Sequence, residues 1–168
     1  MDLTEIYYVL AATGVLVAAI YYIMSLRYNM RARQMEIIRL HTSDFGSEQG
    51  LQRNMAVMNM EWKDYEDFMK KYGFSNPEMA SKWCSMLYMY EATGLIIKNK
   101  IVKPELIYDL AGYGVPLMWE RFKDVIQGWR AEWGRETWTN AEFFVKEMLK
   151  IKLRNDPSFK INLRLIEP

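Results

Sequence analysis

Histidine and cysteine are nearly absent from this chain of 168 residues, which contains one of each, His41 and Cys84. A single cysteine cannot form a disulfide within the chain, which agrees with a reducing, cytoplasmic compartment. A single histidine excludes a metal site built on two histidines and acid–base catalysis by a histidine pair. We expect His41 to be solvated or to cap a helix. We expect Cys84 to be a buried, inert thiol, because no activating neighbour is apparent.

Motifs for phosphate binding, metalloprotease chemistry and serine-nucleophile hydrolysis are also missing from the sequence. The net charge is only +1, with basic and acidic residues interspersed, which argues against nucleic acid as a partner. One acidic cluster could bind a metal or act in acid–base chemistry, but we expect a solvated helix face there: Glu61, Asp64, Glu66 and Asp67. These absences predict a protein that is not an enzyme and binds no cofactor or metal.

Charged residues are absent from residues 6–26, which read IYYVLAATGVLVAAIYYIMSL. As a helix with a rise of about 1.5 Å per residue, this stretch is about 31 Å long, enough to cross the hydrocarbon core of a bilayer. A cleaved signal peptide would start with positive charge and have a shorter apolar run, whereas Asp2 and Glu5 start this chain. A buried helix of a soluble domain is the other alternative, but such helices seldom run this far without a charge. We therefore predict a transmembrane helix.

Basic residues flank the predicted membrane helix on one side only. No lysine or arginine precedes it, and four arginines follow it closely: Arg27, Arg31, Arg33 and Arg39. Positively charged flanks stay on the cytoplasmic side. The sequence therefore predicts a single-pass protein of the cell membrane, with its N-terminus outside and its C-terminal domain in the cytoplasm. The lipid bilayer is the first expected partner, and the same arginines could attract anionic headgroups.

Apolar residues continue beyond the predicted span at steps of three and four, with one arginine interrupting the series: Ile23, Leu26, Met30, Ile37 and Leu40. This extension either lies on its own domain or forms a membrane-proximal stalk that pairs with another helix. Turn-forming residues at 44–47 then mark a break. We predict three parts: a transmembrane helix with a basic extension (1–43), a helical cytoplasmic domain (44–157) and a tail (158–168).

The cytoplasmic part has the periodicity of a compact all-α bundle of about five helices. The first, residues 47–72, carries an apolar stripe: Leu51, Met55, Met58, Trp62, Tyr65, Met69 and Tyr72. Asn76, Pro77 and Glu78 are a strong start signal for the second helix. The remaining three helices are predicted over residues 104–111, 116–133 and 139–155.

Methionine is unusually frequent, with 13 in the chain, and Met55, Met58 and Met60 lie within one and a half helical turns. Clustered thioethers suit Cu(I), so a copper site is one alternative. The bundle core is the other, because methionine fills irregular gaps and two of these residues belong to the apolar stripe. We favour the core.

Three charged residues lie at the borders of predicted apolar faces, namely Glu91, Arg121 and Arg130. An acid that is partly buried between helices should bind a guanidinium group. We predict an ion pair between Glu91 and one of the two arginines. The alternative is that all three are surface charges.

The tail changes from helical to alternating periodicity, with apolar residues at every second position: Phe159, Ile161, Leu163 and Leu165. A period of two predicts an extended segment. The tail could lie in a groove of its own domain, or it could bind a partner protein as extended peptides do.

The stretch from Trp83 to Leu149 resembles a family catalogued as a domain of unknown function. The similar features are the spaced aromatic and charged residues in YEATGLIIKNKIVKPELIYDLAGYGVPLMWERFKDVIQGWR and the later EFFVKEML. The resemblance implies one N-terminal membrane helix followed by an all-helical cytoplasmic domain. It implies no activity, so it assigns no functional residues.

These expectations together favour a membrane-anchored interaction or accessory protein, such as a small non-catalytic subunit of a membrane complex. The expected protein partner is another membrane protein or a second copy of the chain. The alternative is a ligand-responsive membrane sensor with an aromatic pocket among Trp83, Tyr90, Trp119 and Trp129.

Overall fold

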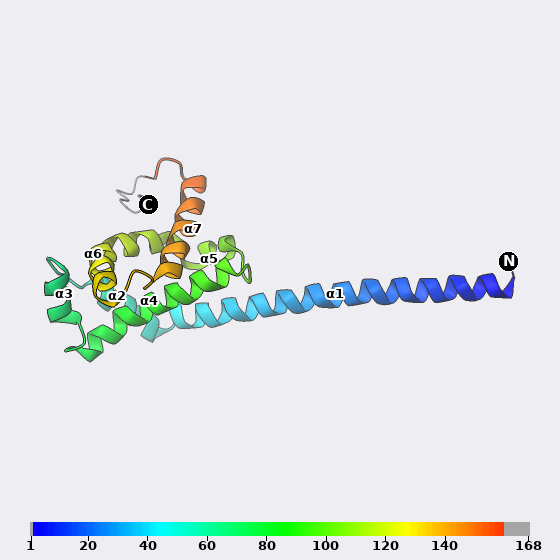
Figure 1. The fold of residues 1–168 in the computed structure, drawn as a ribbon, viewed down its shortest axis with the longest axis horizontal. Coiled ribbons are helices and arrows are strands. Elements are labelled where there is room, and N and C mark those ends of the chain that lie inside the picture. The colour runs from blue at the N-terminus through cyan, green and yellow to red at the C-terminus, as the bar shows by residue number, and fades with distance from the viewer. Residues whose placement is uncertain (1, 160–168) are drawn as a thin grey trace. The chain divides into compact units, whose positions relative to one another are not determined.

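The computed structural model describes residues 2–159, and within them all regular secondary structure is helical. Seven α-helices and one 3-10 turn follow in order: α1 (Leu3–Phe45), α2 (Glu48–Met58), α3 (Tyr65–Tyr72), α4 (Pro77–Lys98), α5 (Pro104–Ala111), η1 (Gly112–Gly114), α6 (Val115–Trp133) and α7 (Thr139–Asn155). The chain divides into two compact units, Met1–His41 and Thr42–Pro168 (Figure 1). The predicted all-α class is confirmed.

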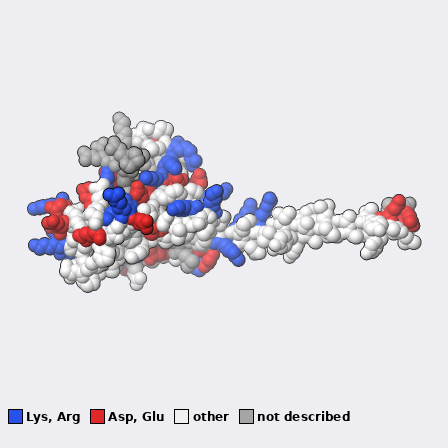
Figure 2. All heavy atoms as spheres, in the orientation of Figure 1, with Lys and Arg blue, Asp and Glu red and all other residues white. Residues whose placement is uncertain are grey.

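Helix α1 is 43 residues long, and its N-terminal part is long and apolar enough to cross a membrane. The side chains of its most apolar stretch are all exposed. Figure 2 shows acidic groups at the N-terminal end of α1, an uncharged length after them, and basic groups only beyond that length. A helix with apolar residues on every side needs an apolar surrounding, which lipid or other helices supply.

Six helices, rather than about five, follow α1 among the described residues, because the helix predicted over residues 47–72 is two helices. Polar groups that compete with the helical backbone explain the break. The carboxylate of Asp64 accepts from the backbone N–H of Asp67 at 2.8 Å and starts α3. The Tyr72 hydroxyl contacts the backbone of Glu61 at 3.1 Å, and Met60 turns into the core with 1% of its surface exposed.

The start of α4 agrees with its sequence signal. The side chain of Asn76 accepts from the backbone N–H of Met79 at 3.3 Å, and Pro77 occupies the first turn. Proline suits this position because its missing N–H would have no helical partner there. The predicted start of this helix is therefore confirmed.

Helices α4 and α7 form the most extensive contact of the domain. They approach closely at Gly94, where a Cβ atom would lie 1.8 Å from the backbone oxygen of Asn140. The start of α7 is also bound to α4 by Glu91, whose carboxylate accepts from the backbone N–H of Ala141 and from the side chain of Asn140, both at 2.7 Å. A carboxylate at a helix N-terminus is favourable because it pairs with free N–H groups and with the helix dipole.

The short helix α3 packs on α6 through the ring of Tyr65. This ring lies against Gly128, where a Cβ atom would come within 2.3 Å of it. The Tyr65 hydroxyl donates to Glu132 at 2.9 Å. Burial and this hydrogen bond raise the pKa of Tyr65 to about 12, so the phenol keeps its proton at neutral pH.

Aromatic rings fill much of the core between α3, α4 and α6. Phe68, Trp83 and Phe122 are almost completely buried. The ring of Phe68 lies 5.2 Å from that of Trp83 and 5.9 Å from that of Phe122, both edge to face. The indole N–H of Trp83 donates to the backbone oxygen of Tyr72 at 2.8 Å. Rings packed in this geometry gain more than their buried area alone provides.

The core position predicted for the apolar stripe of α2 is wrong. Leu51, Met55 and Met58 are 49%, 63% and 58% exposed, whereas Val57 is buried. The prediction assumed that one face of a single long helix continues into the core. Because the chain breaks after Met58, α2 turns a different face inward.

Candidate functional site

The arginines that follow the apolar stretch of α1 are exposed: Arg27, Arg31, Arg33 and Arg39. Arg39 makes an ion pair with Glu36 one turn earlier, at 2.7 Å. Exposed arginine side chains on a helix can bind phosphate oxygens of lipid headgroups or acidic groups of a protein. This segment is therefore one candidate contact region of the molecule.

The predicted ion pair between Glu91 and an arginine is not formed. Both oxygens of Glu91 bind the start of α7 instead, at Asn140 and Ala141. Arg121 donates to the backbone oxygen of Met60 and lies over the ring of Trp62, with 5.3 Å between its guanidinium carbon and the ring centroid. Tertiary contacts of this kind leave no trace in helical periodicity, so the sequence did not identify these partners.

Arg130 binds the loop between α6 and α7 rather than Glu91. Its Nε donates to the backbone oxygen of Thr137 at 2.9 Å, and its Nη2 makes an ion pair with Glu142 at 2.8 Å. Partial burial opposes ionisation of Glu142, but hydrogen bonds from Lys146 and Arg130 outweigh it and lower the pKa of this carboxyl. The loop is therefore anchored by a charged network.

Trp138, at the end of this loop, has the left-handed backbone angle φ 63°, which is rare for an aromatic residue. The loop also starts with a positive angle, at Gly134, where φ is 106°. The backbone oxygen of Trp138 is 3.4 Å from Nη2 of Arg130 and accepts from the backbone N–H of Glu142 at 3.0 Å. Strained residues persist where surrounding contacts impose them, and they cluster at functional sites.

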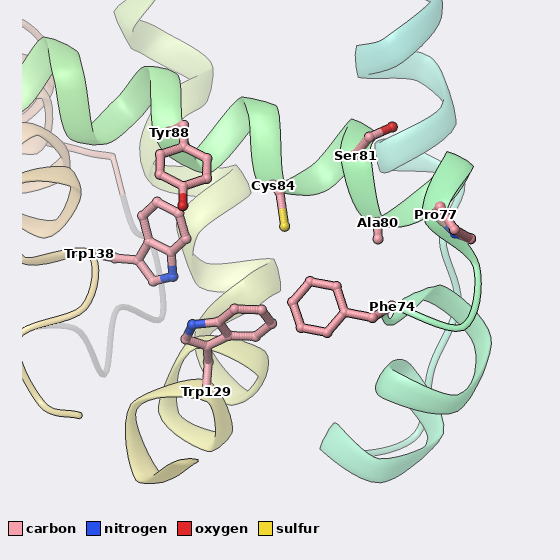
Figure 3. A pocket seen from close by; sticks show the side chains of 8 residues that line it. All are labelled: Phe74, Pro77, Ala80, Ser81, Cys84, Tyr88, Trp129 and Trp138. Atoms are coloured by element: carbon pink, nitrogen blue, oxygen red, sulfur yellow. The ribbon is translucent and has the colours of Figure 1, made fainter. Parts of the chain in front are cut away.

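An aromatic pocket of about 330 Å³ lies beside this loop (Figure 3). Eight residues from α4, α6 and the adjoining loops line it: Phe74, Pro77, Ala80, Ser81, Cys84, Tyr88, Trp129 and Trp138. Phe74 and Tyr88 are more than half exposed, whereas Trp129 and Trp138 are buried. The pocket wall therefore combines two buried indole rings with two exposed aromatic rings.

The polar groups of this pocket are few and uncharged. Burial raises the pKa of the Cys84 thiol to about 11, so the sulfur is protonated at neutral pH and is not a nucleophile. The Ser81 hydroxyl donates to the backbone oxygen of Glu78 at 2.8 Å. The indole nitrogen of Trp138 has no hydrogen-bond partner among the described residues. A mostly apolar concavity with a few polar groups is typical of a small-molecule site.

The pocket does not lie where the sequence placed it. Trp83, Tyr90 and Trp119 belong to the core with 1%, 4% and 3% of their surfaces exposed, and of the four predicted residues only Trp129 lines the pocket. Sequence reasoning missed Phe74, Tyr88 and Trp138. Trp138 lies just before the predicted start of α7. An aromatic residue in a loop between two helices was therefore the sequence signal that could have identified it as a lining residue.

The described residues contain no group of three or more His, Cys, Asp and Glu side chains arranged to hold a metal ion. The methionines divide between surface and core, with Met55 and Met58 exposed and Met60 and Met86 buried.

Of the tail residues proposed for partner binding, Phe159 is half-buried, and the ammonium group of Lys152 lies 4.7 Å from the centroid of the Phe159 ring. The other tail residues proposed for partner binding lie outside the described residues: Ile161, Leu163 and Leu165.

Comparison with known families gives a match over residues 9–158 to the family described as a domain of unknown function, DUF4760. Searches of curated proteins and of solved structures gave no significant match. The family match includes most of α1 and the whole helical domain. The chain therefore belongs to this family, as its resemblance indicated.

Proposed function

We propose that this DUF4760 family member is a membrane-anchored interaction protein, a small non-catalytic subunit of a membrane complex. The observation that carries the proposal is the exposed, uncharged apolar stretch of α1. Exposing about twenty apolar side chains to water is strongly unfavourable, and insertion into a bilayer removes them from it. In this proposal α1 holds the helical domain at the cytoplasmic face of the cell membrane.

The orientation follows from the position of the arginines. Arg27, Arg31 and Arg33 come directly after the apolar stretch, and the only charged side chains before it are the acidic ones of Asp2 and Glu5. Translocation of several arginines is costly, so this end stays in the cytoplasm and the N-terminus lies outside.

Cysteine labelling in intact cells tests the membrane topology. In a Cys84→Ser background, Asp2→Cys and Ser158→Cys each place one thiol at an exposed position of the described chain. A membrane-impermeant maleimide should label Asp2→Cys in intact cells and Ser158→Cys only after permeabilisation. The reverse pattern would reject the orientation, and recovery of the full chain in the soluble fraction would reject the anchor.

The partner is expected to be another membrane protein or a second copy of this chain. The exposed face of α2 supports this, because Leu51, Met55 and Met58 recur at steps of four and three. Apolar side chains that line one exposed helix face are typical of a helix that binds a second protein.

Site-specific photocrosslinking in the membrane tests this surface. A benzophenone amino acid at Met55 should give one adduct of defined mass, and the same group at Asp124 on α6 should not. An adduct at twice the mass of the chain would identify a homo-oligomer.

The tail is the second candidate surface, so deletion of residues 159–168 should reduce adduct yield if it contributes. If this deletion reduces neither the adduct yield nor the recovery of a copurifying partner, the tail has no role in partner binding.

A ligand-responsive membrane sensor is the second candidate function, and the aromatic pocket favours it. The pocket is about 330 Å³, within the range of small-molecule sites, and a strained aromatic residue forms part of its wall. A sensor would change its contacts when the pocket fills. The α2 photocrosslink therefore also tests this function, because its yield should change when a ligand binds.

A further inference from the structure

Trp138 combines two unfavourable features in the wall of the aromatic pocket. Its indole Nε1 is buried without a hydrogen-bond partner among the described residues. Its backbone holds a left-handed angle although only 6% of the residue is exposed. Buried donors are nearly always paired, because an unpaired one has lost its hydrogen bonds to water. This N–H has almost no accessible surface, so an acceptor in the pocket would supply the missing partner once the Trp138 ring turns slightly toward the cavity.

Two buried indole rings, those of Trp129 and Trp138, form part of the pocket wall. In Figure 3 the nitrogen-bearing edges of Trp129 and Trp138 face one another, and the sulfur of Cys84 points toward the rings from α4. Ring contacts hold these walls in place. The ring of Tyr88 lies 4.8 Å from that of Trp138, and the ring of Phe74 lies 5.6 Å from that of Trp129, both edge to face.

The charge of the lining selects a neutral ligand. None of the eight described lining residues is acidic or basic. A carboxylate or phosphate would lose its hydration here without gaining a counter-charge. Aromatic cages do bind quaternary ammonium groups, but an unpaired N–H donor repels a cation. The apolar rings and the donor together suit a flat molecule with one acceptor.

We propose that this pocket binds a neutral planar ring compound whose carbonyl or ring nitrogen accepts a hydrogen bond from Nε1 of Trp138. An apolar cavity of about 150 Å³ holds benzene, so a pocket of about 330 Å³ accommodates one or two fused rings. This proposal deepens the sensor function by naming the ligand class, and it is independent of the partner of the anchored protein.

Quinoline and naphthalene are matched probes, because they have the same shape and differ by one acceptor nitrogen. The full chain, labelled with nitrogen-15 in lipid nanodiscs, should bind quinoline about tenfold more tightly than naphthalene. Empty nanodiscs correct for partition into lipid. The Trp138 indole N–H resonance should move with quinoline and not with naphthalene, which tests the hydrogen bond in the unmodified chain.

Substitutions separate the donor from the shape of the pocket. Trp138→Phe should bind quinoline and naphthalene with about equal affinity. Trp119→Phe, which removes an indole N–H from the core, should keep the preference for quinoline. Cys84→Phe should fill the pocket and abolish binding of both probes, whereas Cys84→Ser should preserve it.

Equal affinity for the two probes with an unmoved Trp138 resonance would overturn the proposal. Absence of binding, or tighter binding of tetramethylammonium than of quinoline, would also overturn it. Quinoline binding that leaves the α2 photocrosslink unchanged would reject the sensor function and keep the ligand site. The topology experiment reports on the membrane anchor whatever the probes do.

Discussion

At the scale of single residues, Arg130 stabilises the loop that places Trp138 in the pocket wall. Its guanidinium group binds two backbone oxygens of the loop and the carboxylate of Glu142. These contacts offset the cost of a left-handed aromatic residue, which is about 1–3 kcal/mol. The stability of the pocket therefore depends on the charge of Glu142.

Glu142→Gln should destabilise the domain by about 1 kcal/mol at pH 7, because it weakens charge-assisted hydrogen bonds to a half-buried carboxyl. The folded state lowers the pKa of Glu142. Its stabilisation is therefore fully present above the unfolded pKa, about 4.3, and is lost as pH falls through the lower folded value. Urea unfolding of the full chain in nanodiscs, followed by tryptophan fluorescence from pH 7 to pH 3, measures this difference.

The difference between the native chain and Glu142→Gln should shrink toward zero at the acid end of this series. Glu136→Gln, at an exposed position of the same loop, is the matched control and should unfold like the native chain throughout. If the loss of unfolding free energy in Glu142→Gln stays constant with pH, the carboxylate charge is not the stabilising feature.

The sequence indicated which charged residues lie partly inside the domain, but it did not indicate which groups they bind. Glu91, Arg121 and Arg130 all make buried or half-buried contacts, as their position beside apolar faces suggested. Their partners are backbone groups and residues of other elements, which depend on how helices cross. Periodicity describes one helix at a time, so it cannot supply these pairings.

At the scale of elements, the helices with strong local start signals were predicted well and the break after α2 was missed. Helix α4 starts at Pro77 as the sequence indicated. The break depends on Asp64, Tyr72 and Arg121, which stabilise an irregular segment through contacts from three parts of the chain. The apolar repeat runs through this segment without interruption, so it predicted one helix.

Gly94→Ala should destabilise the domain by about 3 kcal/mol or more, because the added Cβ would lie 1.8 Å from a backbone oxygen of α7. Backbone atoms cannot move aside as a flexible side chain can, so α4 and α7 must separate. The midpoint of urea unfolding in nanodiscs measures the loss. Gly114→Ala is the control, since its Cβ would meet no atom within 4 Å. Equal midpoints for the two variants would show that the contact at Gly94 tolerates a side chain.

At the scale of the whole molecule, charge placement around the apolar stretch governs the proposed orientation. Changing Asp2 and Glu5 to lysine and Arg27, Arg31 and Arg33 to glutamate moves the positive flank to the other end of the helix. The inverted chain should place its helical domain outside the cell. Maleimide labelling of Ser158→Cys without permeabilisation measures the result.

A chain with the same number of substitutions at exposed positions far from the apolar stretch is the control for that experiment. Asp124 and Glu136 changed to lysine, with Lys63, Lys70 and Arg135 changed to glutamate, serve this purpose, because all five are exposed residues of the helical domain. The control should keep the native labelling pattern. Unchanged orientation of the inverted chain would mean that another determinant, such as folding of the domain before insertion, sets the topology.

The contact between Tyr65 and Gly128 has a consequence for how other members of this family can vary. Helix α3 rests on α6 through a ring that occupies the space a side chain at position 128 would need. The two positions should therefore change together during divergence. Relatives that carry a bulky residue in place of this glycine should lack the aromatic residue opposite it and should attach the short helix differently. The pair thus offers a marker for sorting the family into groups with different docking of that helix.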